Sequence, residues 1–270
     1  MLTIVIPTIG RADSFERALK SACRTCDEVV KQILIVDNSQ SAFLSQLNIS
    51  CSLDNRIKVL SYNERKSMAD SWNTALHQVT QPWVLFLHDD DELISEKFRE
   101  LRLENFNPAD VSFIAFDYYR RRNRYKRLVA RGSYDKNNLC VSIIKSPPTF
   151  VSTIFSLSAL RNIGGWNMDY GYFLDLVGYL ELAKYKTALF EPSAIGVYTV
   201  DDPDQLSAIE NRASSYGDYI PAVTAKVFQL CDDVESRKTL INLLSTFVYP
   251  LSGSRFSRRV KRVMTAIKNA

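Results

Sequence analysis

WVLFLHDDDE, residues 83–92, joins five consecutive apolar residues to a histidine and four acidic side chains. A run that is apolar at every position is typical of a strand buried on both faces of a parallel sheet. The candidate elements before it are strands at 2–6, 32–36 and 57–60 and helices at 13–30 and 69–79. This alternation predicts an α/β fold with an open sheet whose ligands bind where the strands end.

The rest of the chain alternates less regularly. We expect strands at 111–118, 149–157 and 187–190, a basic loop or hairpin at 120–131, and helices at 158–163, 173–184 and from 218 onward. We therefore divide the chain into a domain at 1–215, with halves at 1–110 and 111–215, and a helical C-terminal extension at 216–270.

The composition is that of an ordinary globular protein, with 46% hydrophobic and 24% charged residues in a chain of 270. A net charge of +4 is too small to indicate nucleic-acid binding. The N-terminal residues fit a first strand better than a signal peptide, and no stretch reaches the roughly 18 apolar residues of a membrane span. We expect a cytoplasmic protein with reduced cysteines, and we interpret Cys23 and Cys26 as structural thiols.

The acidic cluster after the 83–87 strand is the sharpest chemical feature. Carboxylates gathered at a buried strand end repel one another unless a cation neutralises them. Mg²⁺ and Mn²⁺ prefer oxygen ligands, commonly one or two carboxylates together with phosphate oxygens. The cluster therefore predicts a divalent metal site beside a nucleotide diphosphate. The alternative is an exposed acidic turn in which Asp91 caps a helix.

Five segments of this chain resemble, in order and spacing, the motifs of family 2 glycosyltransferases. They are TIVIPTIGR (3–11), IVDNS (35–39), NERKSMADSWNTAL (63–76), FLHDDDEL (86–93) and IGGWNMDYGYFLDLVGYLELA (163–183). The resemblance implies a GT-A fold, a Rossmann-like mixed sheet flanked by helices. It also implies a nucleoside-diphosphate sugar donor, for which we favour a UDP-sugar, and inversion at the anomeric carbon.

The resemblance also implies which residues bind the donor nucleotide: Pro7, Thr8, Arg11, Asp37, Asn63, Arg65, Lys66 and Asp89. The chemistry of Asp37 agrees, because a carboxylate accepts hydrogen bonds from a base N–H or from sugar hydroxyls. Its alternative role is to end a strand in an Asx turn. The family often has a second acidic residue where this chain has Asn38. Arg65 and Lys66 are either phosphate ligands or solvated loop charges.

The metal ligands implied by the resemblance are His88, Asp90 and Asp91. The first aspartate of the family's D-x-D motif aligns with His88, so the motif is either 88–90 with a changed first member or 89–91 shifted by one. Asp90 belongs to both registers and is the leading ligand. An imidazole can bind Mn²⁺ or donate a hydrogen bond to the diphosphate.

Asp175 aligns with the catalytic base of the family, whereas Leu174 replaces the first member of the usual acidic pair. An inverting transfer needs one carboxylate that takes the proton of the acceptor hydroxyl. Asp175 is otherwise a favourable acidic residue at a helix N-terminus. Asp169 is the reserve base, and we expect Asp169, Trp166 and Tyr170 on the acceptor side, although both aromatic residues equally fit a core.

The C-terminal stretch 254–270 places cations beside an apolar stripe at helical spacing. Such a helix either lies on an anionic membrane surface or packs on the domain. We favour the membrane, because a lipid-linked saccharide acceptor would account for a tail that binds there. The family resemblance implies a role in bacterial surface polysaccharide synthesis. Two other functions remain: a sugar nucleotidyltransferase, which should show a glycine-rich loop after the first strand, and a catalytically silent nucleotide- or sugar-binding relative.

Overall fold

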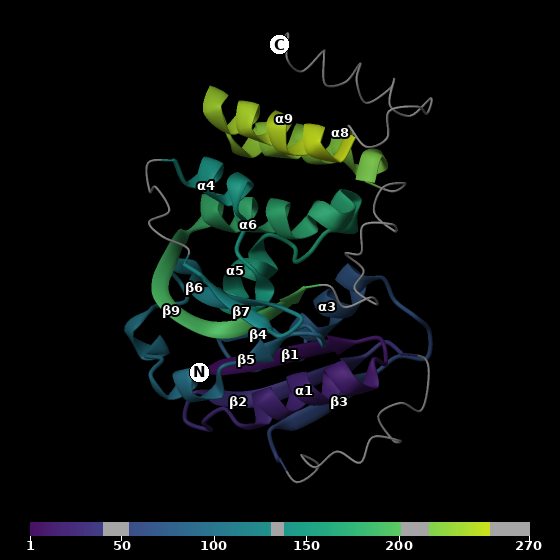
Figure 1. Ribbon diagram of the computed structural model, residues 1–270, viewed down its shortest axis with the longest axis vertical. Helices are drawn as coiled ribbons and strands as arrows, with labels where there is room; N and C mark the ends of the chain where they lie inside the picture. The colour runs from purple at the N-terminus through teal and green to yellow at the C-terminus, as the bar shows by residue number, and fades with distance from the viewer. Residues whose placement is uncertain (40–53, 131–137, 201–215, 249–270) are drawn as a thin grey trace.

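The computed structural model describes residues 1–39, 54–130, 138–200 and 216–248. Its core is a mixed nine-stranded sheet in the order β3-β2-β1-β4-β8-β6-β9-β5, with β7 paired to β6 (Figure 1). Helices cover both faces of the sheet. This agrees with the α/β architecture expected from the sequence.

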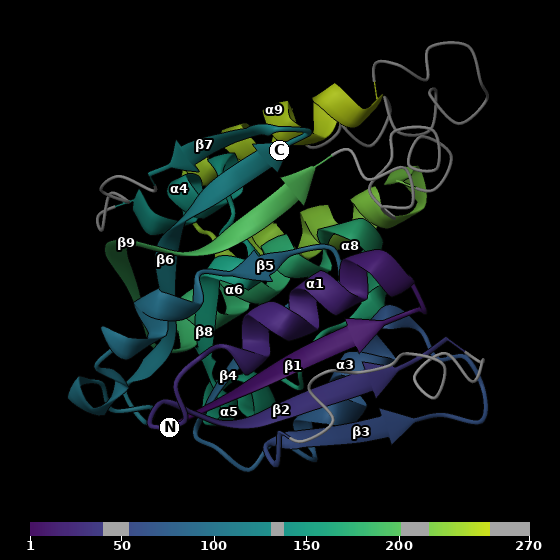
Figure 2. The same ribbon diagram turned by 60° about the horizontal axis from the view of Figure 1, so that its bottom comes forward.

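The N-terminal half of the sheet is parallel. Its elements are β1 (Leu2–Thr8), α1 (Ala12–Cys23), β2 (Val30–Asp37), β3 (Ile57–Ser61), α3 (Met68–Leu76) and β4 (Trp83–Phe86). β1 pairs with both β2 and β4 in parallel, and its last residue, Thr8, lies opposite Asp37. The polar residues that follow β1, β2 and β4 therefore lie at the carboxyl ends of these strands, on the same side of the sheet. The arrows of β1 and β2 point the same way in Figure 2.

The second half joins the sheet through an antiparallel strand, β8, which lies between β4 and β6. Its elements are β5 (Glu92–Leu93), 3₁₀ turns at Ser95–Arg99 and Leu103–Asn105, β6 (Val111–Arg122), β7 (Tyr125–Val129), α4 (Leu139–Lys145), a 3₁₀ turn at Phe150–Ser152, β8 (Thr153–Ser156), α5 (Leu157–Asn162), a 3₁₀ stretch at Met168–Phe173, α6 (Leu174–Tyr185) and β9 (Thr187–Val200). The long strand β9 runs parallel to β6 and curves around it (Figure 1).

Two apolar clusters pack on the two faces of the sheet. Successive residues of a strand point to opposite faces, so Ile4 and Ile6 pack toward α1 while Val5 packs toward α3 and α6. The C-terminal helices α8 (Tyr216–Leu230) and α9 (Val234–Val248) contribute Val223 and Leu240 to the second of these clusters. The helical extension thus packs on the α6 side of the sheet.

Several element boundaries differ from the sequence expectation. α1 ends at Cys23 rather than near residue 30, because a turn follows it and β2 begins at Val30. The 187–190 strand continues to Val200, since β6 pairs with it over almost its whole length. α4 and β5 were not expected. Where a basic loop or hairpin was expected, residues 118–129 form a β-hairpin, in which Asn123 adopts the left-handed conformation at the turn (φ 52°).

Candidate donor and metal site

Thr8, the last residue of β1, and Arg11, in the loop that follows it, hold two of the three aspartates that follow β4. The hydroxyl of Thr8 donates to Asp89 Oδ2 at 2.7 Å, and the Arg11 guanidinium forms an ion pair with the other oxygen of that carboxylate. A second guanidinium nitrogen lies 3.3 Å from Asp90 Oδ2. Both aspartates are buried. Arg11 therefore supplies the positive charge that offsets the repulsion between these neighbouring carboxylates.

Asp91 points away from Arg11 and is held by the second half of the sheet. Its Oδ1 accepts a hydrogen bond of 2.8 Å from the backbone N–H of Thr199 in β9. Burial, reinforced by the negative charge of Asp90, raises the pKa of the Asp91 carboxyl well above its ordinary value. The Thr199 hydroxyl accepts from Arg121, which also pairs with Glu92. A polar network thus connects the acidic cluster to the β6–β9 pair.

His88 packs its imidazole against two aromatic rings. The ring centroids of Trp72 and Phe150 lie 5.2 Å and 5.1 Å from that of His88. Burial lowers the pKa of the imidazole, although the charges of Asp90 and Asp89 oppose this shift. Its Nε2 is buried and has no hydrogen-bond partner. A neutral imidazole with an unpaired nitrogen beside carboxylates is able to bind a metal ion.

Three residues of the cluster can converge on one cation. Ligand atoms of His88, Asp90 and Asp91 all lie within 4.8 Å of one another. They are the three residues that the sequence indicated as metal ligands. Asp89 instead accepts a hydrogen bond from Thr8 and pairs with Arg11. A mixed set of carboxylate oxygens and one imidazole fits Mn²⁺ or Mg²⁺ better than a thiol-seeking metal.

The loops after β2 and before α3 form the other side of this sheet edge. Asp37 is buried and accepts from the backbone N–H of Ser39 at 2.9 Å, which is the Asx turn considered above. Asn38 exchanges two 2.9 Å hydrogen bonds with the backbone of Lys66, one to the carbonyl and one from the N–H. The amide of Asn38 thus fixes the neighbouring loop. The remaining predicted donor-side residues divide into half-buried Pro7 and exposed Asn63, Arg65 and Lys66.

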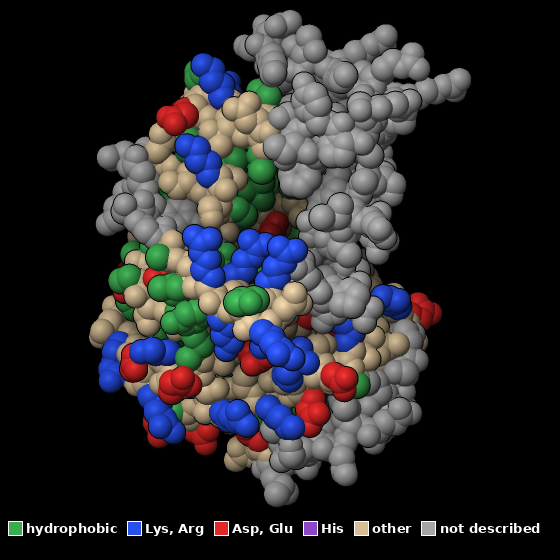
Figure 3. Space-filling model, in the orientation of Figure 1, with side chains coloured by type: hydrophobic (Ala, Val, Ile, Leu, Met, Phe, Trp, Pro, Cys, Tyr) green, Lys and Arg blue, Asp and Glu red, His purple; other side chains and the backbone are tan. Residues whose placement is uncertain are grey.

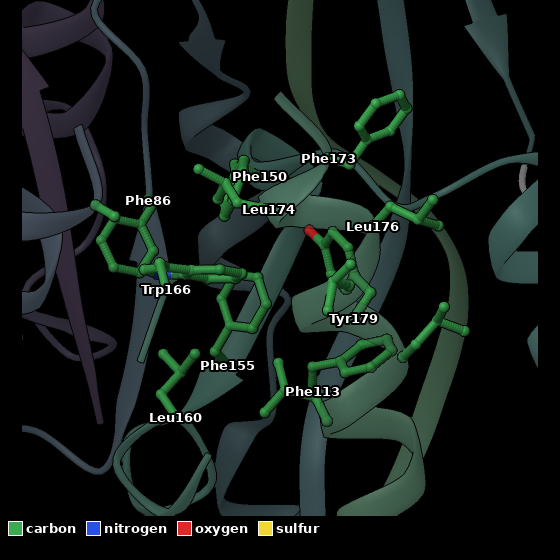
Figure 4. Packing of buried hydrophobic residues seen from close by; sticks show 14 of the residues in the cluster. Phe86, Phe113, Phe150, Phe155, Leu160, Trp166, Phe173, Leu174, Leu176 and Tyr179 are labelled. Carbon is green, nitrogen blue, oxygen red and sulfur yellow. The ribbon is translucent and has the colours of Figure 1, made fainter. Parts of the chain in front are cut away.

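Asp175 lies in the first turn of α6, half-buried between apolar neighbours. Burial raises the pKa of its carboxyl to about 6, although the N–H of Leu176 donates to Oδ1 at 2.7 Å and opposes the shift. The adjoining Leu174 and Phe173 belong to the same apolar cluster as Phe150, the ring that contacts His88 (Figure 4). A carboxylate with a pKa near 6 is well suited to accept a proton near neutral pH.

The predicted acceptor-side residues lie in different surroundings. Trp166 is only 2% exposed and packs edge-on against Phe150 and Phe155 (Figure 4), so its ring offers no face to a sugar in this structure. Its role here is the core role that the sequence left open. Tyr170 is half-buried and Asp169 is exposed, in the 3₁₀ stretch that leads into α6. These two remain candidates for acceptor contact.

The model of the family "Glycosyl transferase family 2" matches residues 3–164, more than half of the chain. The chain belongs to glycosyl transferase family 2. The matched residues include the loops after β1 and β2 and the acidic cluster, whereas Asp175 lies beyond them.

One curated relative of this family 2 member is a Campylobacter jejuni GalNAc(5)-diNAcBac-PP-undecaprenol beta-1,3-glucosyltransferase, 33% identical over 95 residues. The match covers 35% of this chain and 31% of the relative, so the chain aligns with about a third of that protein's length.

Solved structures show the fold more fully. TarS of S. aureus in complex with UDP-GlcNAc matches with a TM-score of 0.65 at 13% identity, over 92% of this chain and 80% of that one. A mannosyltransferase of Pyrobaculum calidifontis, in complex with GDP-Man and Mn²⁺, matches with a TM-score of 0.62 at 17% identity, over 100% of this chain and 80% of that one. The GT-A fold expected for this family 2 chain is confirmed.

Sequence reasoning missed three residues that shape the site. The backbone N–H of Thr199 donates to Asp91, and Arg121 donates to the Thr199 hydroxyl. Both residues lie in strands far along the chain, and no local sequence pattern indicates their role. Asn73 holds the backbone at Trp166 through its side-chain amide. An asparagine within a helix is a weak helix former, and this was the one available sign that Asn73 has a specific partner.

Proposed function

We propose that this chain is a metal-dependent, inverting glycosyltransferase. It transfers a sugar from a nucleoside-diphosphate donor, for which we favour a UDP-sugar, to a saccharide or lipid-linked saccharide. The observation that carries the proposal is the cluster of His88, Asp90 and Asp91 at the carboxyl ends of the parallel strands, with ligand atoms within 4.8 Å of one another. Family membership supports the transfer chemistry.

His88, Asp90 and Asp91 would hold a divalent cation, Mn²⁺ or Mg²⁺. When bound there, the ion offsets the charge that develops on the leaving diphosphate. Arg11 already neutralises Asp89 and Asp90, so it lies where a diphosphate would meet the cluster. We assign Arg11 and Thr8 to the donor phosphates, Asp37 to the ribose or base, and Pro7, Asn63, Arg65, Lys66 and Asp89 to the edges of the same donor site.

Asp175 is the proposed catalytic base. In a single displacement, the acceptor oxygen forms a bond to the anomeric carbon while the bond to the diphosphate breaks. The hydroxyl proton passes to the Asp175 carboxylate, whose raised pKa of about 6 favours this step. Asp169 and Tyr170 flank the acceptor, with Asp169 as the reserve base.

The setting is proposed from relatives and from the tail. The Campylobacter jejuni relative carries a lipid-linked saccharide in its name. We infer a lipid-linked or polymeric acceptor, a role in surface polysaccharide synthesis and a position on the inner face of the membrane. Within the described residues no helix is long and apolar enough to cross a bilayer. The 254–270 tail, which we predicted to bind membranes, lies outside the described residues.

Calorimetric titration of UDP, GDP, dTDP and CDP, with and without Mn²⁺, tests this function. We expect one nucleotide to bind tightly, and only when the metal is present. Asp90→Ala should abolish this metal-dependent binding. Asp13→Ala removes an exposed aspartate of α1 and is the matched control. The proposed site would be refuted if no nucleotide bound, or if binding were the same without Mn²⁺ and in the Asp90→Ala variant.

A catalytically silent relative is the second candidate. His88 and Leu174 stand where the family usually has acidic residues, and this favours it. A turnover assay distinguishes the two candidates. The enzyme hydrolyses or transfers the sugar of its preferred donor, whereas a silent relative binds the donor and releases it unchanged.

A further inference from the structure

The β6–β7 hairpin carries the densest positive charge in the described chain. Residues 118–130 contain no acidic side chain, and their six cations are Arg120, Arg121, Arg122, Arg124, Lys126 and Arg127. All but Arg121 are exposed. Figure 3 shows Lys and Arg side chains gathered across the middle of the face on which Figure 1 places β7. We call this surface the basic hairpin.

The pairing of the two strands places like charges opposite one another. Arg120 faces Arg127, and Arg121 faces Lys126. Like charges directly across two strands destabilise a hairpin. The charge of Arg121 is compensated by Glu92, whose Oε1 lies 2.5 Å from Arg121 Nη1. Within the described ranges no ion pair is made by the other four cations in question: Arg120, Arg124, Lys126 and Arg127. Among the described residues, these four cations of the hairpin therefore have no acidic partner.

Exposed apolar side chains lie on both faces of the hairpin: the register places Tyr125 on the face of Arg120 and Arg127, and Leu128 on the face of Lys126. Tyr125, next to the turn, is 83% exposed, and Leu128 is 47% exposed. Tyrosine is typical of residues that sit at the headgroup level of a bilayer. Cations surrounding exposed aromatic and aliphatic groups characterise surfaces that bind anionic membranes, where charge attracts the protein and apolar groups enter the interface.

We infer that the basic hairpin binds an anionic phospholipid surface. The inference concerns a different surface from the 254–270 tail, and it stands whether or not the enzyme transfers sugar. The hairpin is connected to the acidic cluster through Arg121 and Thr199, whose backbone N–H binds Asp91. Contact at the hairpin would therefore bring the membrane to the side of the domain on which the acidic cluster lies.

Vesicle flotation of the full chain tests the charge component. We compare vesicles of phosphatidylcholine alone with vesicles that also contain phosphatidylglycerol. Because each surface cation strengthens binding about fivefold, we expect Arg120→Gln with Arg127→Gln to weaken binding to the anionic vesicles about 25-fold. Arg24→Gln with Arg99→Gln removes the same charge from two exposed positions elsewhere and should change binding little. Equal binding by the hairpin variant and wild type would overturn the inference.

Fluorescence of Tyr125→Trp tests whether the tip enters the bilayer. The three native tryptophans, Trp72, Trp83 and Trp166, are at most 3% exposed and should not respond to vesicles. We expect a blue shift of the introduced tryptophan on anionic vesicles, and none on phosphatidylcholine vesicles or on soluble heparin. Vesicle binding without a blue shift, or equal hairpin-dependent binding to heparin, would overturn the lipid assignment in favour of another contact or of a soluble polyanion.

Discussion

The side-chain amide of Asn73 holds both backbone polar groups of Trp166. Its Nδ2 donates to the Trp166 carbonyl at 2.8 Å, and its Oδ1 accepts from the Trp166 N–H at 2.8 Å. The two residues lie 93 positions apart, in α3 and in the turn after α5. This one amide therefore fixes α3 to the segment that leads into α6.

Replacing Asn73 should destabilise the fold. We expect Asn73→Ala to lower the free energy of unfolding by about 2 kcal/mol, because two hydrogen bonds are lost and two buried backbone groups lose their partners. Denaturant unfolding measures this. Asn162→Ala, at an exposed position, should change stability by less than about 0.5 kcal/mol. A loss no larger than that of the control would mean that water replaces the amide without cost.

Gly171 should tolerate alanine less well than Gly164 does. Both have positive φ, 51° and 83°, but an added Cβ at Gly171 would lie 2.3 Å from the Tyr219 ring of α8, whereas at Gly164 nothing lies within 4 Å. Gly164→Ala then costs only backbone strain, about 1–2 kcal/mol, and Gly171→Ala costs about 1–3 kcal/mol more from overpacking. Thermal unfolding of the two variants gives the difference. Equal losses would show that Tyr219 moves aside freely.

His88→Phe should separate packing from metal binding. A phenyl ring keeps the contacts with Trp72 and Phe150 and removes a buried nitrogen that has no partner. We expect stability to change by less than about 1.5 kcal/mol, as for other swaps of similar volume, and Mn²⁺ affinity to fall at least tenfold. Electron paramagnetic resonance titration of free Mn²⁺ measures the affinity. An unchanged affinity would remove His88 from the ligand set and leave the carboxylates alone.

Asp175→Asn should abolish transfer and yet stabilise the protein at neutral pH. The pKa of the folded chain, about 6, lies above the ordinary value of 3.8, so the folded state binds more protons between these values and loses stability as the pH rises through them. Asparagine does not ionise, so we expect the free energy of unfolding of the variant to exceed that of the wild type by on the order of 1–3 kcal/mol at pH 7. Below pH 4 we expect no difference.

The activity of the wild type should fall as the pH drops through about 6, since the base must be ionised to take the proton. Chemical unfolding at pH 4 and 7 and a pH profile of kcat/KM measure the two effects. Asp13→Asn, at an exposed position of α1 outside the proposed site, is the control for both. Loss of activity with unchanged stability at pH 7 would mean that Asp175 is not desolvated.

Local sequence determined the elements whose side chains are buried on all sides. The strands at 2–6, 32–36 and 83–87 were readable because a strand covered on both faces must be apolar at every position. The position of the acidic cluster followed from the strand before it. Features set by contacts between distant segments were not readable, and β9 illustrates this: its length comes from pairing with β6 rather than from its own residues.

The sequence by itself determined the family, the parallel core and the presence of three carboxylates at a strand end. Only the tertiary structure decided which partner each carboxylate has, because the partners come from other strands. Asp89 accepts a hydrogen bond from Thr8, and Asp91 accepts one from Thr199, 108 residues away. It also decided that Trp166 is a core residue, since aromatic packing depends on neighbours that the local sequence does not contain. The local sequence determines which side chains are available, and tertiary packing determines which of them contact one another.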